Sequence, residues 1–200
     1  MKNIDNNFWD DKHSNNDQWW LTGTLIEQLY HYHLLSYDYL KNKKILEIGV
    51  GLGTCTIELN KLSETVFCSD VSEIALERVK SFSTDQFLSK DLKEIPPVDV
   101  AICHLVFQHC TDIEVERIIN EINLTDGGIF SFQFAALQNG VLTLQMQELV
   151  SRGELFFRDL ETIKTIVERS NKEIFYISDP KWWGGKNKHN WYIIKIRNKQ

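Results

Sequence analysis

The chain has 200 residues, 42% of them hydrophobic and 25% charged, which fits one globular domain with its own core and excludes an intrinsically disordered chain. Its formal net charge of −6 argues against a nucleic-acid partner, because nucleic-acid binders usually carry a basic surface. No apolar run approaches the about 18 residues of a membrane span, and the polar N-terminus lacks the apolar stretch of a signal peptide, so we expect a cytoplasmic protein without membrane contact.

The first 40 residues differ in composition from the rest of the chain. They are rich in Asn, Asp and aromatic residues and end in a predicted helix from about Thr22 to Tyr39. We expect residues 1–40 to form an extension or lid packed on a domain of residues 41–200. The six tryptophans lie only at the two ends of the chain, at positions 9, 19, 20, 182, 183 and 191.

From residue 43 onward, short apolar runs alternate with helical periods, a pattern typical of a parallel sheet covered by helices. One helix is predicted by the capping box Thr111 to Glu114, which precedes apolar residues at helical spacing. The turn signal at 126–128 is expected to lead into the strand at 129–134. The predicted strands are 43–48, 65–70, 98–106, 128–134, 173–178 and 190–196.

Three glycines, Gly49, Gly51 and Gly53, follow the first predicted strand and precede a predicted helix. Such a turn lets a ligand approach the backbone and directs helix N-terminal amides toward it. The third glycine comes one residue earlier than in the dinucleotide fingerprint GxGxxG, and Glu47 stands two residues before the first glycine. This glycine spacing disfavours an NAD-dependent reductase, which stays an alternative. The three glycines could also form a plain tight turn that binds no ligand.

Further candidate residues stand at the ends of the following strands, where open parallel sheets bind their ligands. Asp70 ends the second strand and can accept hydrogen bonds from both hydroxyls of a ribose. Asp91 follows a short third strand and can accept from an exocyclic amine of a purine. His104 ends the fourth strand. Each carboxylate taken alone could also be a helix cap, but their joint order favours a cofactor site.

Five segments resemble motifs of the class I S-adenosylmethionine-dependent methyltransferases. They are the ExGxGxG pattern at 47–53, FCSDVSEIALE at 67–77, SKDLKEIP at 89–96, VDVAICHLVFQHC at 98–110 and LTDGGIFSF at 124–132. The resemblance implies an α/β, Rossmann-like, doubly wound sheet of seven mostly parallel strands in one domain. Its last strand would be antiparallel, so that 173–178 and 190–196 form a closing hairpin.

The resemblance also implies S-adenosylmethionine as cofactor and assigns its contacts. Glu47, Gly49 and Gly51 would line the methionine end, and Asp70 would hold the ribose. Val71 would pack on the adenine, Asp91 and Leu92 would meet its edge, and His104 would lie beneath the sulfonium. Gly53 completes the predicted cofactor site. Thr125 and Asp126 replace the Lys-Pro of the family's fifth-strand motif, in a surface turn.

Methyl transfer to a hydroxyl benefits from a base that removes its proton, and four histidines are candidates for this role. We predict His109 and His104 as catalytic; His13 and His189 lie in polar end segments that favour a surface position. His109 could instead only cap or pack against the helix that begins at Asp112. The segment from Cys103 to Cys110 predicts no metal site, because neighbouring strand residues point to opposite faces.

The acceptor site is predicted among the aromatic end segments and two glutamines. Tryptophan faces suit sugars, planar rings or cations, although these residues could simply fasten the N-terminal segment to the sheet. We expect O-methylation of a sugar or sugar-linked small molecule by a monomer or homodimer. The alternatives are a protein or nucleic-acid methyltransferase, or a non-catalytic protein that binds the cofactor. The predicted substrate-binding residues are Trp19, Trp20, Gln108, Gln133, Trp183 and His189.

Overall fold

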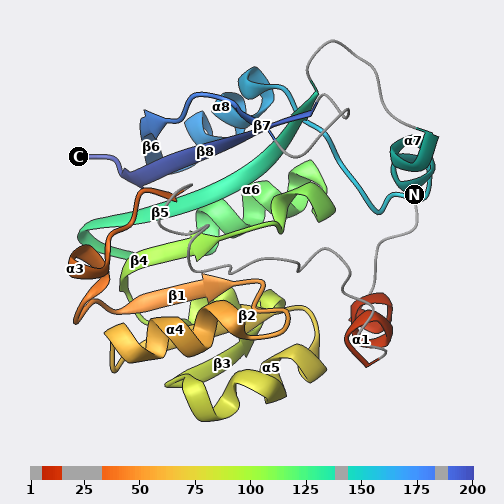
Figure 1. The fold of residues 1–200 in the computed structure, drawn as a ribbon. Helices are drawn as coiled ribbons and strands as arrows, with labels where there is room; N and C mark the ends of the chain where they lie inside the picture. Colours follow the sequence, from red (N-terminus) through yellow and green to blue (C-terminus); the bar gives the residue numbers. More distant parts are fainter. Residues whose placement is uncertain (1–5, 15–32, 138–143, 183–188) are drawn as a thin grey trace.

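The computed structural model of the chain describes residues 6–14, 33–137, 144–182 and 189–200. These residues form one twisted sheet with helices on both faces (Figure 1). The main strand order is β3-β2-β1-β4-β5-β8-β6, and a two-residue strand β7 pairs with β8. The strands are β1 Ile45–Ile48, β2 Val66–Asp70, β3 Asp85–Leu88, β4 Val98–Cys103, β5 Leu124–Leu137, β6 Lys172–Ile177, β7 Lys181–Trp182 and β8 His189–Asn198.

Strand directions follow the predicted fold class. Strands β1 to β5 pair in parallel, while β8 runs antiparallel to both β5 and β6. The sheet is therefore the expected seven-stranded, mostly parallel one with an antiparallel last strand, and β7 is a short addition to it. The order of connections reverses between β1 and β4, which are neighbours in the sheet but not in the chain. Ligand sites of open α/β sheets form at this reversal.

Helices cover the two faces of the sheet, and we call these faces front and back. The front face carries α4 and α5 over β1 and β2, with α3 and residues 33–36 beside them, and the back face carries α6 and α8 (Figure 1). Helix α1 contacts α5. The helices are α1 Asn6–Ser14, α3 Tyr37–Leu40, α4 Thr54–Leu62, α5 Glu73–Val79, α6 Asp112–Glu121, α7 Leu144–Ser151 and α8 Leu160–Glu168, with 3-10 turns η1 Lys80–Phe82, η2 Ser89–Glu94 and η3 Phe107–His109.

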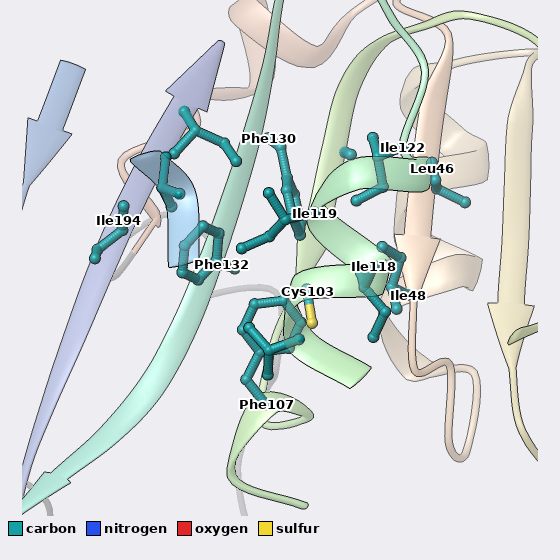
Figure 2. Packing of buried hydrophobic residues seen from close by; sticks show 14 of the residues in the cluster. Leu46, Ile48, Cys103, Phe107, Ile118, Ile119, Ile122, Phe130, Phe132 and Ile194 are labelled. Carbon is teal, nitrogen blue, oxygen red and sulfur yellow. The ribbon is translucent and has the colours of Figure 1, made fainter. Parts of the chain in front are cut away.

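The back face holds the larger apolar cluster. Figure 2 shows Ile118, Ile119 and Ile122 of α6 pointing toward strand residues that include Phe130 and Phe132. Alternation along the strands places these aromatic residues on one face, because successive side chains point to opposite sides. The predicted capping box also forms: the Thr111 side chain accepts from the Glu114 N–H, and the Glu114 carboxylate accepts from the Thr111 N–H.

Two local predictions differ from the structure. Residues 34–36 are not helical and Leu34 has φ +49°, so no continuous helix reaches Tyr39; the rest of that predicted helix lies outside the described residues. Strand β5 begins before the predicted turn, because residues 125–128 form an irregularity in its pairing with β4 instead of interrupting the strand. No helix among the described residues has both the length and the apolarity to cross a membrane.

Candidate active site

A cavity opens at the carboxyl ends of β1, β2 and β4, at the reversal of the strand order. Its wall includes the glycine turn, the end of β2 and the residues after β4. Helix α1 contributes Trp9 and His13, and the η3 turn contributes His109. The cavity therefore brings together residues that lie up to 109 positions apart in the sequence, from Trp9 to Ile118.

The glycine turn has a backbone shape that an L side chain would strain. Gly49 has φ +80°, and a Cβ there would lie 2.1 Å from the Val106 Cγ2 atom. Gly51 has φ +54°, and the nearest atom to its hypothetical Cβ is the His13 Cε1 atom at 4.0 Å. Only glycine adopts such φ values readily. The turn can therefore expose its backbone to a ligand at Gly51, while Gly49 makes room for the loop after β4.

Glu47 places a buried carboxyl group in the cavity wall. It lies on β1, and the Thr56 hydroxyl donates to its Oε2 atom at 2.6 Å. Burial raises the pKa of Glu47 to about 7, and the nearby Asp70 charge adds to this, while hydrogen bonds from Thr56 and Cys55 oppose it. A cationic group bound beside Glu47 would favour its ionised form.

Asp70 sits at the end of β2, where its carboxylate joins two backbone segments. The Gly51 N–H donates to its Oδ2 atom at 3.2 Å, and the Ser72 N–H donates to its Oδ1 atom at 3.0 Å. Burial raises the pKa of Asp70, and these hydrogen bonds together with His13 oppose the shift. Each carboxylate oxygen keeps acceptor capacity, so the group can still receive hydroxyls from a ligand.

His109 has a fixed tautomer on the opposite wall. Its Nδ1 atom lies 2.8 Å from the carbonyl oxygen of Glu154, and because a carbonyl only accepts, Nδ1 carries the proton. Burial lowers the pKa of His109, which keeps the ring neutral near pH 7. The neutral ring therefore has its lone pair on Nε2. The Trp9 ring packs edge-to-face against it, with centroids 5.0 Å apart.

A strap at residues 154–158 holds the turn that carries His109. The Arg158 guanidinium donates to the Phe107 carbonyl at 2.8 Å and to the Cys110 carbonyl, and pairs with Asp112 at 2.7 Å. The Phe156 N–H also donates to the Gln108 carbonyl at 2.6 Å. These bonds fix both ends of η3, so the position of His109 depends on a segment distant in sequence.

Matches to known proteins agree with this architecture. The family model described as a methyltransferase domain matches residues 45–125, the part of the chain that supplies the glycine turn, Asp70 and the end of β4. This part of the chain is similar to a methyltransferase domain. The assignment of S-adenosylmethionine as the cofactor of this chain stays a prediction.

Solved methyltransferase structures share the fold at low sequence identity. The N-methyltransferase NodS from Bradyrhizobium japonicum WM9, in complex with S-adenosyl-L-homocysteine, is 19% identical over 96% of this chain and 97% of its own, with a TM-score of 0.68. The magnesium protoporphyrin IX methyltransferase ChlM from Synechocystis PCC 6803 is 16% identical over 98% of this chain and 100% of its own, with a TM-score of 0.62. No match was found among the curated protein sequences.

The structure gathers most of the predicted cofactor residues around one cavity. The residues that line it are Glu47, Gly49, Gly51, Asp70, Val71 and His104, together with the predicted base His109. Gly53 precedes α4 and lies outside the cavity lining. A Cβ at Gly53 would lie 2.6 Å from the Val79 Cγ1 atom. Leu92 is buried in the back-face core, and Ser89 lines the cavity in place of Asp91. The roles of all these residues stay predictions.

The predicted acceptor residues are less well placed by the structure. Gln108 and Gln133 are buried outside the cavity lining, and their Oε1 atoms have no hydrogen-bond partner among the described residues. Trp19, Trp20 and Trp183 lie outside the described residues, as does the side chain of His189 on β8.

Two aromatic residues of the cavity are not predicted from the sequence. Composition marks Trp9 only as one of the end tryptophans, and the polar end segment predicts a surface position for His13. Both line the cavity from α1, and His13 is buried, with a pKa that burial lowers. The one available signal was the concentration of aromatic residues near the N-terminus. Among the described residues, no group of three His, Cys, Asp or Glu side chains could hold a metal ion.

Proposed function

We propose that this methyltransferase transfers a methyl group to a hydroxyl oxygen of a small molecule, with a sugar or sugar-linked acceptor favoured. The observation that carries the proposal is the tautomer of His109. A neutral imidazole with its lone pair on Nε2 shares a cavity with the glycine turn and Asp70. A hydroxyl is a weak nucleophile until its proton is removed, and this ring can remove it.

The residues of the cavity fit the cofactor. Bound S-adenosylmethionine supplies an activated methyl group on a positively charged sulfur. Glu47 offers a carboxylate for the cationic methionine end, and the Gly51 backbone leaves open space for close approach. Asp70 would accept the ribose hydroxyls, and Val71 would contact the adenine. Asp91 and Leu92 would contact the adenine edge through the backbone of η2, because the Leu92 side chain is buried in the core.

The acceptor side supports a polar ring compound that packs on aromatic faces. Trp9 offers such a face beside His109. Helix α1 also meets the cofactor half, because Arg78 of α5 donates to the His13 carbonyl and the Ser72 hydroxyl donates to Asp10. These contacts support residues 1–40 as a lid. Trp19, Trp20, Gln108, Gln133, Trp183 and His189 remain proposed acceptor contacts.

The catalytic steps of the chain reduce to positioning and proton transfer. The cavity holds the acceptor oxygen in line with the methyl group, which supplies much of the acceleration. The hydroxyl proton would pass to His109 Nε2 as the oxygen–carbon bond forms and the carbon–sulfur bond breaks. The Glu154 carbonyl stabilises the resulting imidazolium through its bond from Nδ1–H.

Substitution His109→Gln tests the proposed base. We expect kcat to fall by about 10²- to 10⁴-fold, while the Kd for S-adenosylmethionine, measured by isothermal titration calorimetry, changes less than about twofold. The matched control is Glu154→Gln, because its backbone carbonyl keeps the bond to His109 and only an exposed ion pair with Arg152 is lost. Unchanged turnover in His109→Gln would remove this base from the mechanism.

An acceptor panel tests the reaction class. It contains matched sugars, amino sugars, phenols, a peptide and an RNA, each incubated with labelled S-adenosylmethionine. NodS is named as an N-methyltransferase, so the amino sugars are the discriminating arm. Methylation of amines alone would exclude the hydroxyl proposal, and methylation of peptide or RNA alone would exclude a small-molecule acceptor.

The remaining part of the proposal concerns partners and location. We propose a cytoplasmic protein that acts without nucleic acid; the net charge of −6 supports the absence of a nucleic-acid partner. We propose a monomer or homodimer, which light scattering coupled to size exclusion would test; a larger assembly would contradict it.

A further inference from the structure

Helix α1 closes one side of the cavity with two of its side chains. Trp9 and His13 stand four positions apart, so they lie on the same side of the helix. His13 faces the glycine turn, because its Cε1 atom is the nearest atom to the place that a Cβ of Gly51 would occupy. Trp9 faces the proposed base, with its ring centroid 5.0 Å from that of His109. One helix therefore contacts both the proposed cofactor half and the proposed acceptor half of the cavity.

Two hydrogen bonds attach α1 to α5, which lies beside it (Figure 1). The Ser72 hydroxyl, at the N-cap of α5, donates to the Asp10 carboxylate. The Arg78 guanidinium, in the last turn of α5, donates to the backbone carbonyl of His13. Only the first of these two bonds uses a side chain of α1, and neither Asp10 nor Ser72 lines the cavity. The attachment can therefore be changed at Asp10 while the cavity wall keeps its residues.

Ser72 joins this attachment to the carboxylate at the end of β2. Its N–H donates to the Oδ1 atom of Asp70 at 3.0 Å, a bond that an Asp readily forms with the residue two positions on. Its Oγ atom accepts from the Ala75 N–H, and its own proton goes to Asp10, because a carboxylate only accepts. In the part of the chain that the structure describes, no other group accepts this proton.

The burial of Ser72 gives this bond its weight. The residue is fully buried, and a buried donor that loses its acceptor costs more than a typical hydrogen bond gains. A bond to a charged acceptor is also stronger than one between neutral groups. The Asp10 carboxylate is therefore a main determinant of where α1 lies on α5.

A ligand in the cavity would favour this docked position of α1. Trp9 and His13 belong to the cavity wall, so a ligand that fills the cavity contacts them only while α1 is docked. A ligand shifts a conformational equilibrium toward the state that it binds better. The effect is reciprocal, so the docking of α1 strengthens ligand binding by the same factor.

We propose that Asp10 is a positioning residue that docks α1 through its bond from Ser72. In the docked position Trp9 forms the wall of the acceptor half beside His109. Docking raises the affinity for the cofactor and for the acceptor together, so that filling one half of the cavity prepares the other. The inference rests on the proposed small-molecule acceptor and its predicted cofactor, and Asp10 itself touches neither of them.

The contact between Trp9 and His109 provides a test that needs no ligand. The full chain, labelled with ¹³C-histidine, is measured by NMR, and His109→Gln assigns the ring signal. An aromatic ring shifts the signals of protons close to it, so Trp9→Ala should move the signal of His109. Asp10→Ala should move it in the same direction. An unchanged His109 signal in folded Asp10→Ala, with folding checked by thermal unfolding, would overturn the proposal.

Two further variants and a double variant separate positioning from a general loss of structure. Asp10→Asn keeps an oxygen that can accept from the Ser72 hydroxyl, so it should leave the His109 signal in place. Glu77→Ala is the matched control, because it removes a carboxylate of α5 whose ion pair with Lys80 is exposed. The double variant of Trp9→Ala and Asp10→Ala should give the signal of Trp9→Ala alone. A further shift in the double variant would contradict an action of Asp10 through Trp9.

Hydrogen exchange and calorimetry test the coupling to the cofactor. Saturating S-adenosylhomocysteine should slow amide exchange at residues 6–14 of the wild type, measured by mass spectrometry. Asp10→Ala should exchange faster there, and its Kd for S-adenosylhomocysteine should rise about three- to tenfold, the value of one hydrogen bond. Asp10→Asn and Glu77→Ala should stay within about twofold of the wild type. Binding without slower exchange would overturn the coupling.

The outcomes distinguish this inference from the proposed function. A wild type that does not bind S-adenosylhomocysteine would contradict the predicted cofactor and the coupling to it, whereas the His109 signal would still report on docking. The kinetic arm uses the compound that the acceptor panel shows to be methylated. Asp10→Ala should raise its KM about three- to tenfold and change kcat less than about twofold, because a saturating acceptor itself docks α1. A lower kcat at unchanged KM would contradict the role in acceptor binding.

Discussion

Strand β5 presents Phe130, Phe132 and Phe134 to the back face of the sheet and Ser131 and Gln133 to the front face, although all five are buried. The back face is filled by α6 and α8 and consists of apolar contacts (Figure 2). The front face of this part of β5 holds the Ser131 hydroxyl, the Gln133 amide and the His33 imidazole. Buried polar groups cost stability unless they are paired, so their presence on one face only marks that face as functional.

The largest expected effect tests the apolar side of this comparison. Phe132→Ala should lower the free energy of unfolding by about 3–5 kcal/mol, because its ring is fully buried and packs 4.9 Å from the Phe107 ring. Ser131→Ala, one residue away on the other face, should cost less, about 1–3 kcal/mol, because His33 Nδ1 loses its buried partner. Urea unfolding of both variants measures the difference. Equal losses would show that the front face is also part of the stabilising core.

A second prediction concerns Arg158, which ties the back-face helix α6 to the cavity. Arg158→Met leaves the Phe107 and Cys110 carbonyls without their donor and should lower the free energy of unfolding by about 2–4 kcal/mol. Turnover should fall further than stability alone explains, because His109 is displaced. Arg152→Met is the control, since its exposed ion pairs contribute at most about 1 kcal/mol. Similar losses of stability and turnover in Arg158→Met and Arg152→Met would contradict the proposed role of the strap in holding His109.

Substitution of Glu47 should have a smaller effect on the free energy of unfolding, and above pH 7 it should raise that free energy instead of lowering it. Burial raises its pKa to about 7, so the folded state binds a proton that the unfolded state releases at lower pH. The free energy of unfolding should therefore fall as pH rises from about 4.5 to 7, and Glu47→Gln should remove this fall. Above pH 7 the variant should be more stable than the wild type, by about 1–3 kcal/mol.

The same substitution should weaken cofactor binding. In the wild type, affinity for S-adenosylmethionine should rise with pH up to about 7, because the cationic ligand favours ionised Glu47. Calorimetry in buffers of different ionisation enthalpy would detect the released proton. Glu47→Gln should bind more weakly and with less pH dependence; the remainder would come from Asp70 and His13. Tighter binding by the variant would place the cationic end elsewhere.

Features of the fold and the cavity that depend on residues close together in the sequence could be predicted. Strand periodicity, the spacing of glycines after β1 and the acid at the end of β2 led to the fold and to one cavity wall. What escaped prediction depends on contacts between distant segments. Nothing local to His33 indicates that it meets Ser131 and His104, which are 98 and 71 residues away in sequence. Leu92 shows the reverse error: its motif position suggested a ligand contact, but its side chain packs in the core.

The strap at residues 154–158 shapes how this protein responds to sequence change. Its backbone carbonyl orients His109 and its backbone N–H holds Gln108, so neither contact depends directly on a side chain. Many side chains are therefore tolerated at Glu154 and Phe156, although not at Arg158, whereas an insertion or a proline would shift the carbonyl register. In a directed-evolution library, length changes in this segment are expected to move His109 and alter turnover although no residue of the cavity wall is substituted.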